Sequence, residues 1–116
     1  MGAPQSNWNE DVVLDPDHLR GFSGGDRDFE AQILAVFADK APGYLADLSS
    51  AGETDWRSNA HKLKGAARSI GAWRLAREAE RAEHQDGIHE DDTLKTRVLQ
   101  ELDSRLQQLL DTIKNR

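Results

Sequence analysis

The apolar residues of this chain recur at intervals of three and four over most of its length, which predicts amphipathic α-helices. After Asp26 the spacing predicts one long helix, and we expect Pro42 to kink or break it after Ala41. The buried stripe expected on this helix consists of Phe29, Ile33, Val36, Phe37, Tyr44 and Leu48. No segment alternates with the period of two that is typical of strands, so the predicted fold is all-α.

Three more helices follow from the same pattern. The first is expected to begin near Thr54 or Asp55 and to end at Gly71, where glycine can supply a left-handed cap. Its apolar stripe consists of Trp56, Ala60, Leu63, Ala67 and Ile70. The next helix runs from about residue 72 to 85, with Leu75, Ala79 and Ala82 facing inward. The last begins near residue 92, and its stripe consists of Leu94, Val98, Leu102, Leu106, Leu109 and Ile113.

A short helix is predicted before these four. Asp15 is placed to cap its start, Pro16 suits the first helical position, and Gly24 marks its end. Four amphipathic helices joined by short polar turns predict an antiparallel up-and-down four-helix bundle, with this short N-terminal helix as a cap.

Length and composition limit the class of protein. At 116 residues, the chain is expected to form one domain over residues 14–116, preceded by a flexible N-terminal arm over residues 1–13 with Trp8 pinned to the body. The absence of cysteine excludes a disulfide framework and a thiolate metal site. No stretch has the apolar length of a membrane span, so a soluble, cytoplasmic protein is expected, without a membrane partner.

Charge is distributed unevenly along the chain. The formal net charge of -6 argues against a nucleic-acid partner, because phosphate contacts need a basic face. Residues 56–83 nevertheless contain seven basic and three acidic side chains, which leaves eight basic and eighteen acidic ones elsewhere. This basic segment predicts a surface for an acidic partner, with Arg57 and Arg68 as partner-binding residues, although a solvated charged face is a commoner origin for such clusters.

The segment NAHKLKGAARSIGA, residues 59–72, sets His61, Lys64 and Gly65 about 130° around the helix from the apolar stripe, on a face expected to meet solvent. A glycine inside a helix costs about 1 kcal/mol relative to alanine, so its presence here calls for a reason. Neutral imidazole is a nucleophile that can carry a phosphoryl group, and a neighbouring lysine can neutralise phosphoryl oxygens. The glycine would then leave room for a partner's active site.

These residues resemble the signature of histidine-containing phosphotransfer (HPt) domains, the modules of bacterial and eukaryotic phosphorelays. The similarity continues through Leu75, Ala82 and Glu83, and upstream it includes Phe37, Pro42 and Leu45, so that it covers about residues 15–113. It implies that His61 is the phosphoacceptor, that Lys64 stabilises phosphoryl charge and that Gly65 gives access to the receiver. Two residues depart from the pattern: Arg68 is bulkier than usual, and Ala82 is smaller.

The resemblance implies a carrier that accepts a phosphoryl group from the aspartate of one receiver domain and passes it to another. The partners would be receiver domains of response regulators or of hybrid histidine kinases, and the carrier would act as a monomer. It would be a stoichiometric intermediate and not an ATP-dependent kinase, since the chain has no glycine-rich phosphate loop. No cofactor or metal is expected on this chain, because Mg²⁺ would be bound by the receiver, and His18, His84 and His89 are interpreted as surface residues.

The sequence is also compatible with a function that involves no catalysis. A helical adaptor could bind a receiver or kinase partner through the same basic face without any covalent step. A reactive histidine and an interfacial one look alike in a single sequence, so a phosphotransfer assay is needed to distinguish the two hypotheses.

Overall fold

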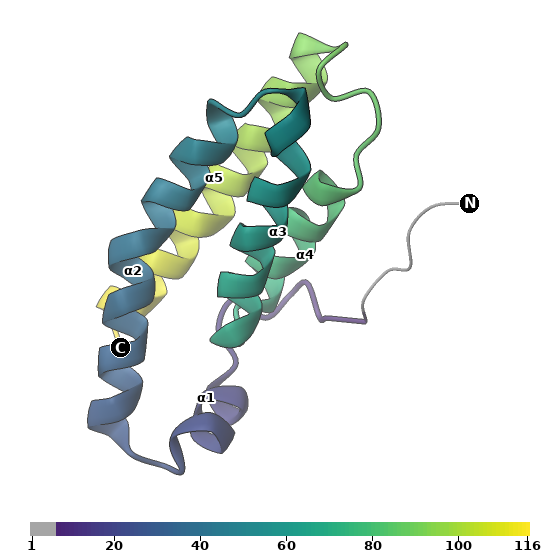
Figure 1. Cartoon of the computed structure of the whole chain (residues 1–116). Helices are drawn as coiled ribbons and strands as arrows, with labels where there is room; N and C mark the ends of the chain where they lie inside the picture. The colour runs from purple at the N-terminus through teal and green to yellow at the C-terminus, as the bar shows by residue number, and fades with distance from the viewer. Residues whose placement is uncertain (1–6) are drawn as a thin grey trace.

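The computed structural model describes residues 7–116, and this part of the chain contains five α-helices and no strand (Figure 1). The helices are α1 (Pro16–Ser23), α2 (Arg27–Ser49), α3 (Glu53–Ser69), α4 (Trp73–Glu83) and α5 (Asp92–Lys114). The prediction of an all-α fold is therefore confirmed. Residues 1–6, and with them half of the predicted N-terminal arm, lie outside the described residues.

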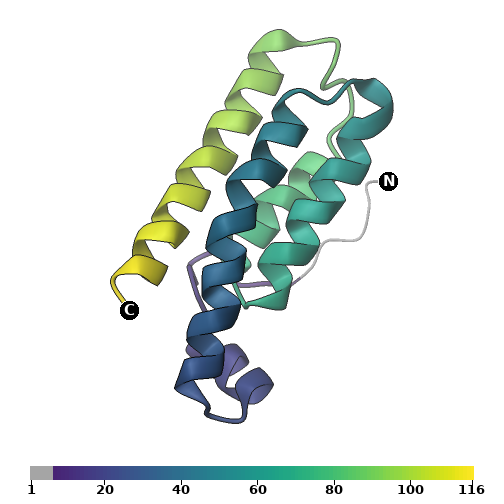
Figure 2. The ribbon, with the colours of Figure 1, turned by 60° about the vertical axis from the view of Figure 1, so that its left-hand side comes forward.

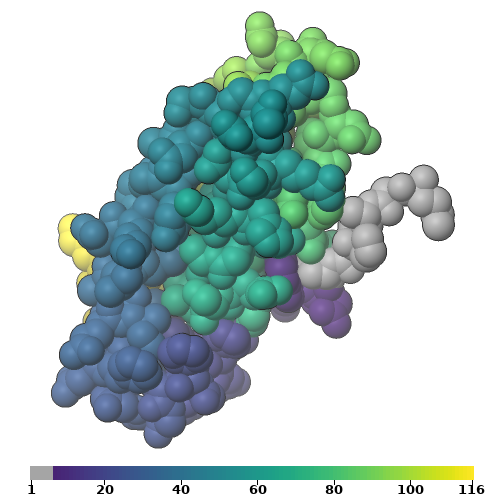
Figure 3. Space-filling view, viewed as in Figure 1, coloured from purple at the N-terminus to yellow at the C-terminus, as the bar shows by residue number. Residues whose placement is uncertain are grey.

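Helices α2, α3, α4 and α5 lie side by side (Figures 1 and 2). Helix α2 packs against α3 and α5, and α4 packs against the same two helices from the other side. Helix α1 contacts α2 at one end of the molecule. In the space-filling view α2 and α3 together form the face turned toward the reader, with α1 below them (Figure 3).

The helix ends follow the local signals. Asp15 caps α1 by accepting hydrogen bonds from the backbone N–H groups of Asp17 and His18, and Asp26 caps α2 in the same way. Gly71 adopts a φ of 78° after α3, and a Cβ at this position would lie only 3.0 Å from the His18 Cβ. Glycine is required there both for the left-handed backbone and for the close approach of α1.

The predicted stripe of α3 is buried at all five positions, and so are Leu75, Ala79 and Ala82 of α4. The prediction for α2 was partly wrong, because Phe29 and Val36 are 42% and 55% exposed. The residues of α2 that enter the core are Leu34, Phe37, Ala41 and Leu48. Contact with both α3 and α5 selects this face, and Phe29 and Val36 lie on a second apolar face well around the helix.

Pro42 does not break α2, which continues without interruption from Arg27 to Ser49. A proline inside a helix removes one backbone hydrogen bond and costs about 3 kcal/mol. Ala41 and Leu48 are fully buried on either side of Pro42, which is itself exposed. Burial of these flanking residues against the bundle therefore outweighs the local cost.

The described part of the predicted arm contacts the helices. The ring of Trp8 stacks on that of Trp73, with 5.8 Å between their centroids, and the carbonyl of Val12 accepts a hydrogen bond from the Arg74 N–H. The Glu10 carboxylate forms ion pairs with Arg81 and Arg105. Residues 7–15, which we call the N-terminal strap, thus join α4 to α5. The boundary between arm and domain stays a prediction.

Candidate functional site

His61 stands on the outer surface of α3, opposite the stripe that packs into the core. Its side chain is 66% exposed, whereas Ala60 and Leu63 beside it are completely buried. The periodicity of α3 therefore explains why the imidazole is displayed to solvent. This exposure allows a second protein to reach the ring.

The imidazole of His61 is held from one side by Glu83, the last residue of α4. The distance from Nδ1 to Glu83 Oε2 is 2.9 Å, and the Glu83 side chain is only 8% exposed. A carboxylate can only accept a hydrogen bond, so Nδ1 carries the proton and donates it to Glu83. The other ring nitrogen, Nε2, is then left with its lone pair available for bonding.

Lys64 binds the second oxygen of the same carboxylate, with 2.5 Å between Nζ and Oε1. Burial alone would raise the pKa of Glu83, but the ammonium of Lys64 and the imidazole of His61 together outweigh it and lower this pKa. Glu83 is therefore ionised at neutral pH. The expectation that Lys64 faces solvent was wrong, because its side chain is only 14% exposed: α4 approaches α3 closely enough to cover it.

Trp56 positions the last turn of α4 against α3. Its indole N–H donates a 2.8 Å hydrogen bond to the carbonyl of Ala82, the residue before Glu83. Trp56 is 3% exposed, and the small side chains of Ala79 and Ala82 let the two helices approach closely. This buried bond fixes how far α4 extends along α3, and so it places Glu83 opposite His61.

The surface next to His61 is open on the side of Gly65. A Cβ built at Gly65 would meet no atom within 4 Å beyond its own helix. Arg57 and Arg68, the predicted partner-binding residues, are both exposed on α3, one turn before His61 and about two turns after it. The structure thus brings His61, Lys64 and Glu83 into direct contact and leaves both arginines on the surrounding face.

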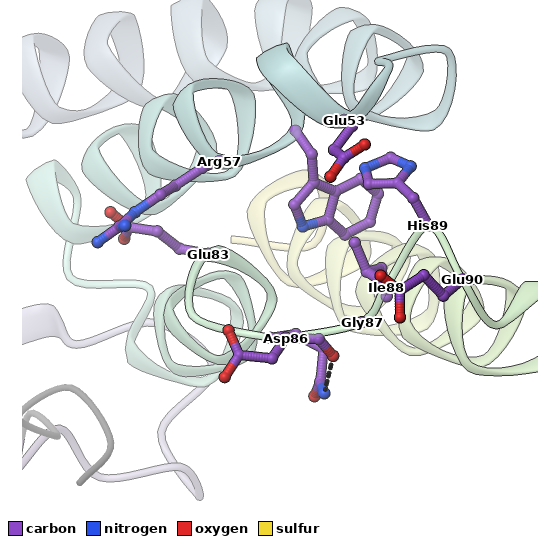
Figure 4. Close-up of a pocket in the computed structure, with 10 residues that line it drawn as sticks. Glu53, Arg57, Glu83, Asp86, Gly87, Ile88, His89 and Glu90 are labelled. Carbon is purple, nitrogen blue, oxygen red and sulfur yellow. Dashed lines mark hydrogen bonds between the residues drawn. The ribbon is translucent and has the colours of Figure 1, made fainter.

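A hollow lies beside this group, between the first half of α3 and the loop that follows α4. Arg57 and Glu83 line one part of it, and Glu53 and His89 line another (Figure 4). The Arg57 side chain extends toward the Glu83 carboxylate and away from Glu53 (Figure 4). A cation and a carboxylate therefore border the hollow at its end near His61.

A second depression, which is mainly apolar, runs between α2 and α3. We call it the α2–α3 groove, and it is lined by Ile33, Val36, Phe37, Lys40, Tyr44, Ala66, Ser69 and Ile70. Beyond it, the exposed rings of Phe22 and Phe29 stack with 6.1 Å between their centroids. The groove and the two stacked rings thus form an apolar area along α1, α2 and the second half of α3.

The remaining histidines are half-buried, so the prediction of plain surface residues was wrong for them. The His18 ring packs edge-on against Trp73 and hydrogen-bonds the Ser69 carbonyl, because α1 folds back onto the end of α3. His89 packs edge-on against Trp56, because the loop before α5 covers that ring. Within residues 7–116, no group of three or more histidine, cysteine, aspartate or glutamate side chains is arranged to hold a metal ion.

Glu83 is the site residue that sequence reasoning did not assign. The resemblance described above includes Glu83 as the glutamate that follows a small residue, but the periodicity of α4 gives no indication of its partner. His61 and Glu83 are 22 residues apart, and only the packing of α4 on α3 brings them together. One signal in the sequence could have indicated this role: Glu83 is a charged residue directly beside Ala82, at the end of the small-residue face of α4.

Comparison with known proteins gives one match. The family model of the Hpt domain matches residues 32–116, which is well over half of the chain. No curated protein and no solved structure matches it. A search of the described helices for a segment of membrane-spanning length and hydropathy found none.

Proposed function

The chain belongs to the Hpt domain family, whose members act in histidine phosphotransfer of two-component signalling, and we propose that its phosphoacceptor is His61. The observation that carries this proposal is an exposed imidazole whose Nδ1 is bound to a buried carboxylate at 2.9 Å. This arrangement leaves Nε2 as the only ring nitrogen free to react. In this proposal residues 14–116 form an antiparallel four-helix bundle with α1 as its cap, preceded by the arm.

The chemistry is a reversible displacement at phosphorus. Nε2 of His61 attacks the phosphorus of a receiver phosphoaspartate, the N–P bond forms, and the P–O bond to the aspartate breaks. The aspartate leaves as a carboxylate, and the ring acquires positive charge. The Nδ1 proton stays on the ring, where Glu83 stabilises the developing imidazolium. The reverse reaction delivers the phosphoryl group to a second receiver.

Lys64 and Gly65 assist at different stages in this proposal. Lys64 supplies positive charge close to the transferring phosphoryl group and keeps Glu83 in place through their 2.5 Å ion pair. Gly65 leaves the receiver's active site free to approach the ring. Mg²⁺ would be bound by the receiver's carboxylates, and this chain would bind no cofactor. It would be a stoichiometric carrier, a monomer of the cytoplasm, with no ATP-dependent kinase activity.

The receiver is proposed to dock on the face formed by α2 and α3. Arg57 and Arg68 would contact acidic groups near the receiver's active site, and the α2–α3 groove would contact apolar residues of the receiver. Exposed Val36 supports this role, because together with the groove it forms a contiguous apolar patch, and such patches commonly mark interfaces.

A phosphotransfer assay tests the assignment. Incubation with phosphorylated receiver domains from the same organism should give an acid-labile phosphoprotein, and His61→Gln should abolish the label while His84→Gln retains it. Lys64→Ala should slow single-turnover transfer more than it weakens receiver binding, because its charge matters most during transfer. Undiminished labelling of His61→Gln would refute the assignment. Receiver binding without any label would favour the helical adaptor instead.

A further inference from the structure

The proposed phosphoryl site needs a cation that can contact the phosphoryl oxygens. A phosphoryl group carries close to two negative charges at neutral pH. The ammonium of Lys64 already neutralises Glu83 at 2.5 Å, and its side chain is 14% exposed. Lys64 therefore supplies charge near the phosphoryl group while its ammonium stays paired with Glu83, and direct contact with the phosphoryl oxygens calls for a second cation.

Arg57 is a cation of α3 whose side chain is exposed. It lies one turn before His61 on α3, and no carboxylate of residues 7–116 forms an ion pair with it. It lines the hollow together with Glu83, whose carboxylate binds the His61 ring (Figure 4). Its side chain extends along α3 toward that carboxylate (Figure 4), which is the group that binds the imidazole of His61.

The other cations of α3 are less well placed. The Lys62 ammonium lies 5.8 Å from the centroid of the Tyr44 ring, on the side of α2. Arg68 is seven residues after His61, which is about 10 Å along the helix axis. Arg57 is four residues before His61, about 6 Å along the axis, so it is the nearer of the two arginines.

From these observations we infer that Arg57 binds the phosphoryl group carried on Nε2 of His61, an inference that rests on the proposed function. Two guanidinium N–H groups of Arg57 donate to two phosphoryl oxygens, which is the bidentate geometry that arginine provides and lysine does not. Arg57 is then a phosphoryl-binding residue in addition to a contact for the receiver. Its role is distinct from that of Lys64, which neutralises Glu83.

A small phosphoryl donor separates this role from docking. Phosphoramidate has no protein surface, so its reaction with His61 depends on the phosphoryl site alone. Nε2 attacks the phosphorus, the N–P bond to His61 forms, and the P–N bond of the donor breaks with ammonia as the leaving group. The proton stays on Nδ1, which continues to donate its hydrogen bond to Glu83, and the product is the same phosphohistidine.

The experiment compares Arg57→Gln with Lys62→Gln, which removes an exposed cation of the same helix on the side of α2, and with Arg57→Lys. Labelling by phosphoramidate should be about tenfold slower in Arg57→Gln, unchanged in Lys62→Gln and intermediate in Arg57→Lys. In ³¹P NMR titrations of the phosphorylated proteins, loss of the arginine should move the phosphoryl titration to higher pH, by about half a unit, because a nearby cation favours the dianion. Circular dichroism checks that all variants are folded.

The outcomes separate the two proposals. If the wild type is labelled at His61 while Arg57→Gln shows the same labelling rate and the same ³¹P titration, the role of Arg57 is refuted and the proposed function stands. If neither phosphoramidate nor any receiver labels the wild type, the proposed function fails, and this inference fails with it. An equal loss of rate in Lys62→Gln would show a general effect of positive charge and would also refute a specific contact.

Discussion

Helix α4 carries two largely buried glutamates, and their surroundings differ in one respect. Glu83 faces α3 and is bound by Lys64 and His61, whereas Glu78 faces α5 and the N-terminal strap, where Arg81 and Arg105 surround it. Their side chains are 8% and 11% exposed. The groups that bind Glu78 are guanidinium cations, which are always protonated, while Glu83 binds an imidazole that is 66% exposed.

This comparison shows how similar ion pairs can serve stability in one place and reactivity in another. Around Glu78 every partner is a permanent cation, and the strap carboxylate of Glu10 adds a further negative charge between the same arginines. The cluster can only hold α4, α5 and the strap together. Around Glu83 one partner is the His61 imidazole, which can form a covalent bond through Nε2 while Nδ1 stays hydrogen-bonded to the carboxylate. Exposure of a nucleophile, and not the presence of ion pairs, separates the two regions.

The largest expected effect on the transfer rate comes from a bulky side chain at Gly65, on the open side of His61. Gly65→Gln should slow phosphotransfer from a receiver by about 100-fold, because a displacement of about 1 Å from the reacting position can cost that much. Its melting temperature should be no lower than that of the parent, since replacement of a helical glycine can stabilise by up to about 1 kcal/mol. Rates and thermal melts are measured on the same preparations.

Gly21 offers a matched control for this prediction. It also lies inside a helix, and a Cβ there would likewise meet nothing within 4 Å. Gly21→Gln should show a similar change in stability with no change in transfer rate. A Gly65→Gln variant that is both stable and fully active would contradict the access role of the glycine.

The second largest effect is expected when the buried glutamate of each region is replaced by glutamine, which removes its charge. Glu83→Gln keeps the shape and a hydrogen-bond acceptor for Nδ1 but removes the charge that stabilises the imidazolium, so transfer should slow by about tenfold. Glu78→Gln removes the corresponding charge from the other region and should lower the free energy of unfolding while the transfer rate is preserved. Single-turnover rates and urea unfolding measure both quantities. Equal losses of transfer rate in the two variants would contradict the distinction between a reactive region around Glu83 and a stabilising region around Glu78.

The smallest effect concerns the strap. Hydrogen bonding to Arg81 lowers the pKa of Glu10 from 4.5 to about 2. Because the folded-state pKa is the lower one, the carboxylate stabilises the fold above pH 4.5, and this contribution is lost as the pH falls toward 2. Glu10 is about one-third exposed, so solvent screening reduces the contribution to about 1 kcal/mol.

Urea unfolding of Glu10→Gln at two pH values tests this sign. The variant should be less stable than the parent at pH 6. The difference should shrink at pH 2.5, which is well below 4.5 and close to the folded-state pKa, because the unfolded parent then binds a proton at Glu10 that the folded parent mostly lacks. Glu90→Gln, a change in the exposed loop before α5, should have little effect at either pH. A difference that is the same at both pH values would show that the strap is not held by this charge.

The sequence by itself determined the helices and the display of His61. Capping residues such as Asp15 and Asp26 act on N–H groups within three residues, and the stripe from Trp56 to Ile70 follows from one helical period. Both are local properties, so a single chain reveals them. The resemblance around His61 was equally readable, because its defining residues occupy consecutive turns of one helix.

Tertiary structure decided which groups meet His61. Helical periodicity gives the face of each helix but not the rotation and offset of its neighbours, so the approach of α4 that buries Lys64 against Glu83 was not predictable. The same limit explains Phe29 and Val36, since α2 has two apolar faces and only contact with α3 and α5 selects one for the core. It explains the strap too, because Glu10 meets arginines that lie 71 and 95 positions further along the chain.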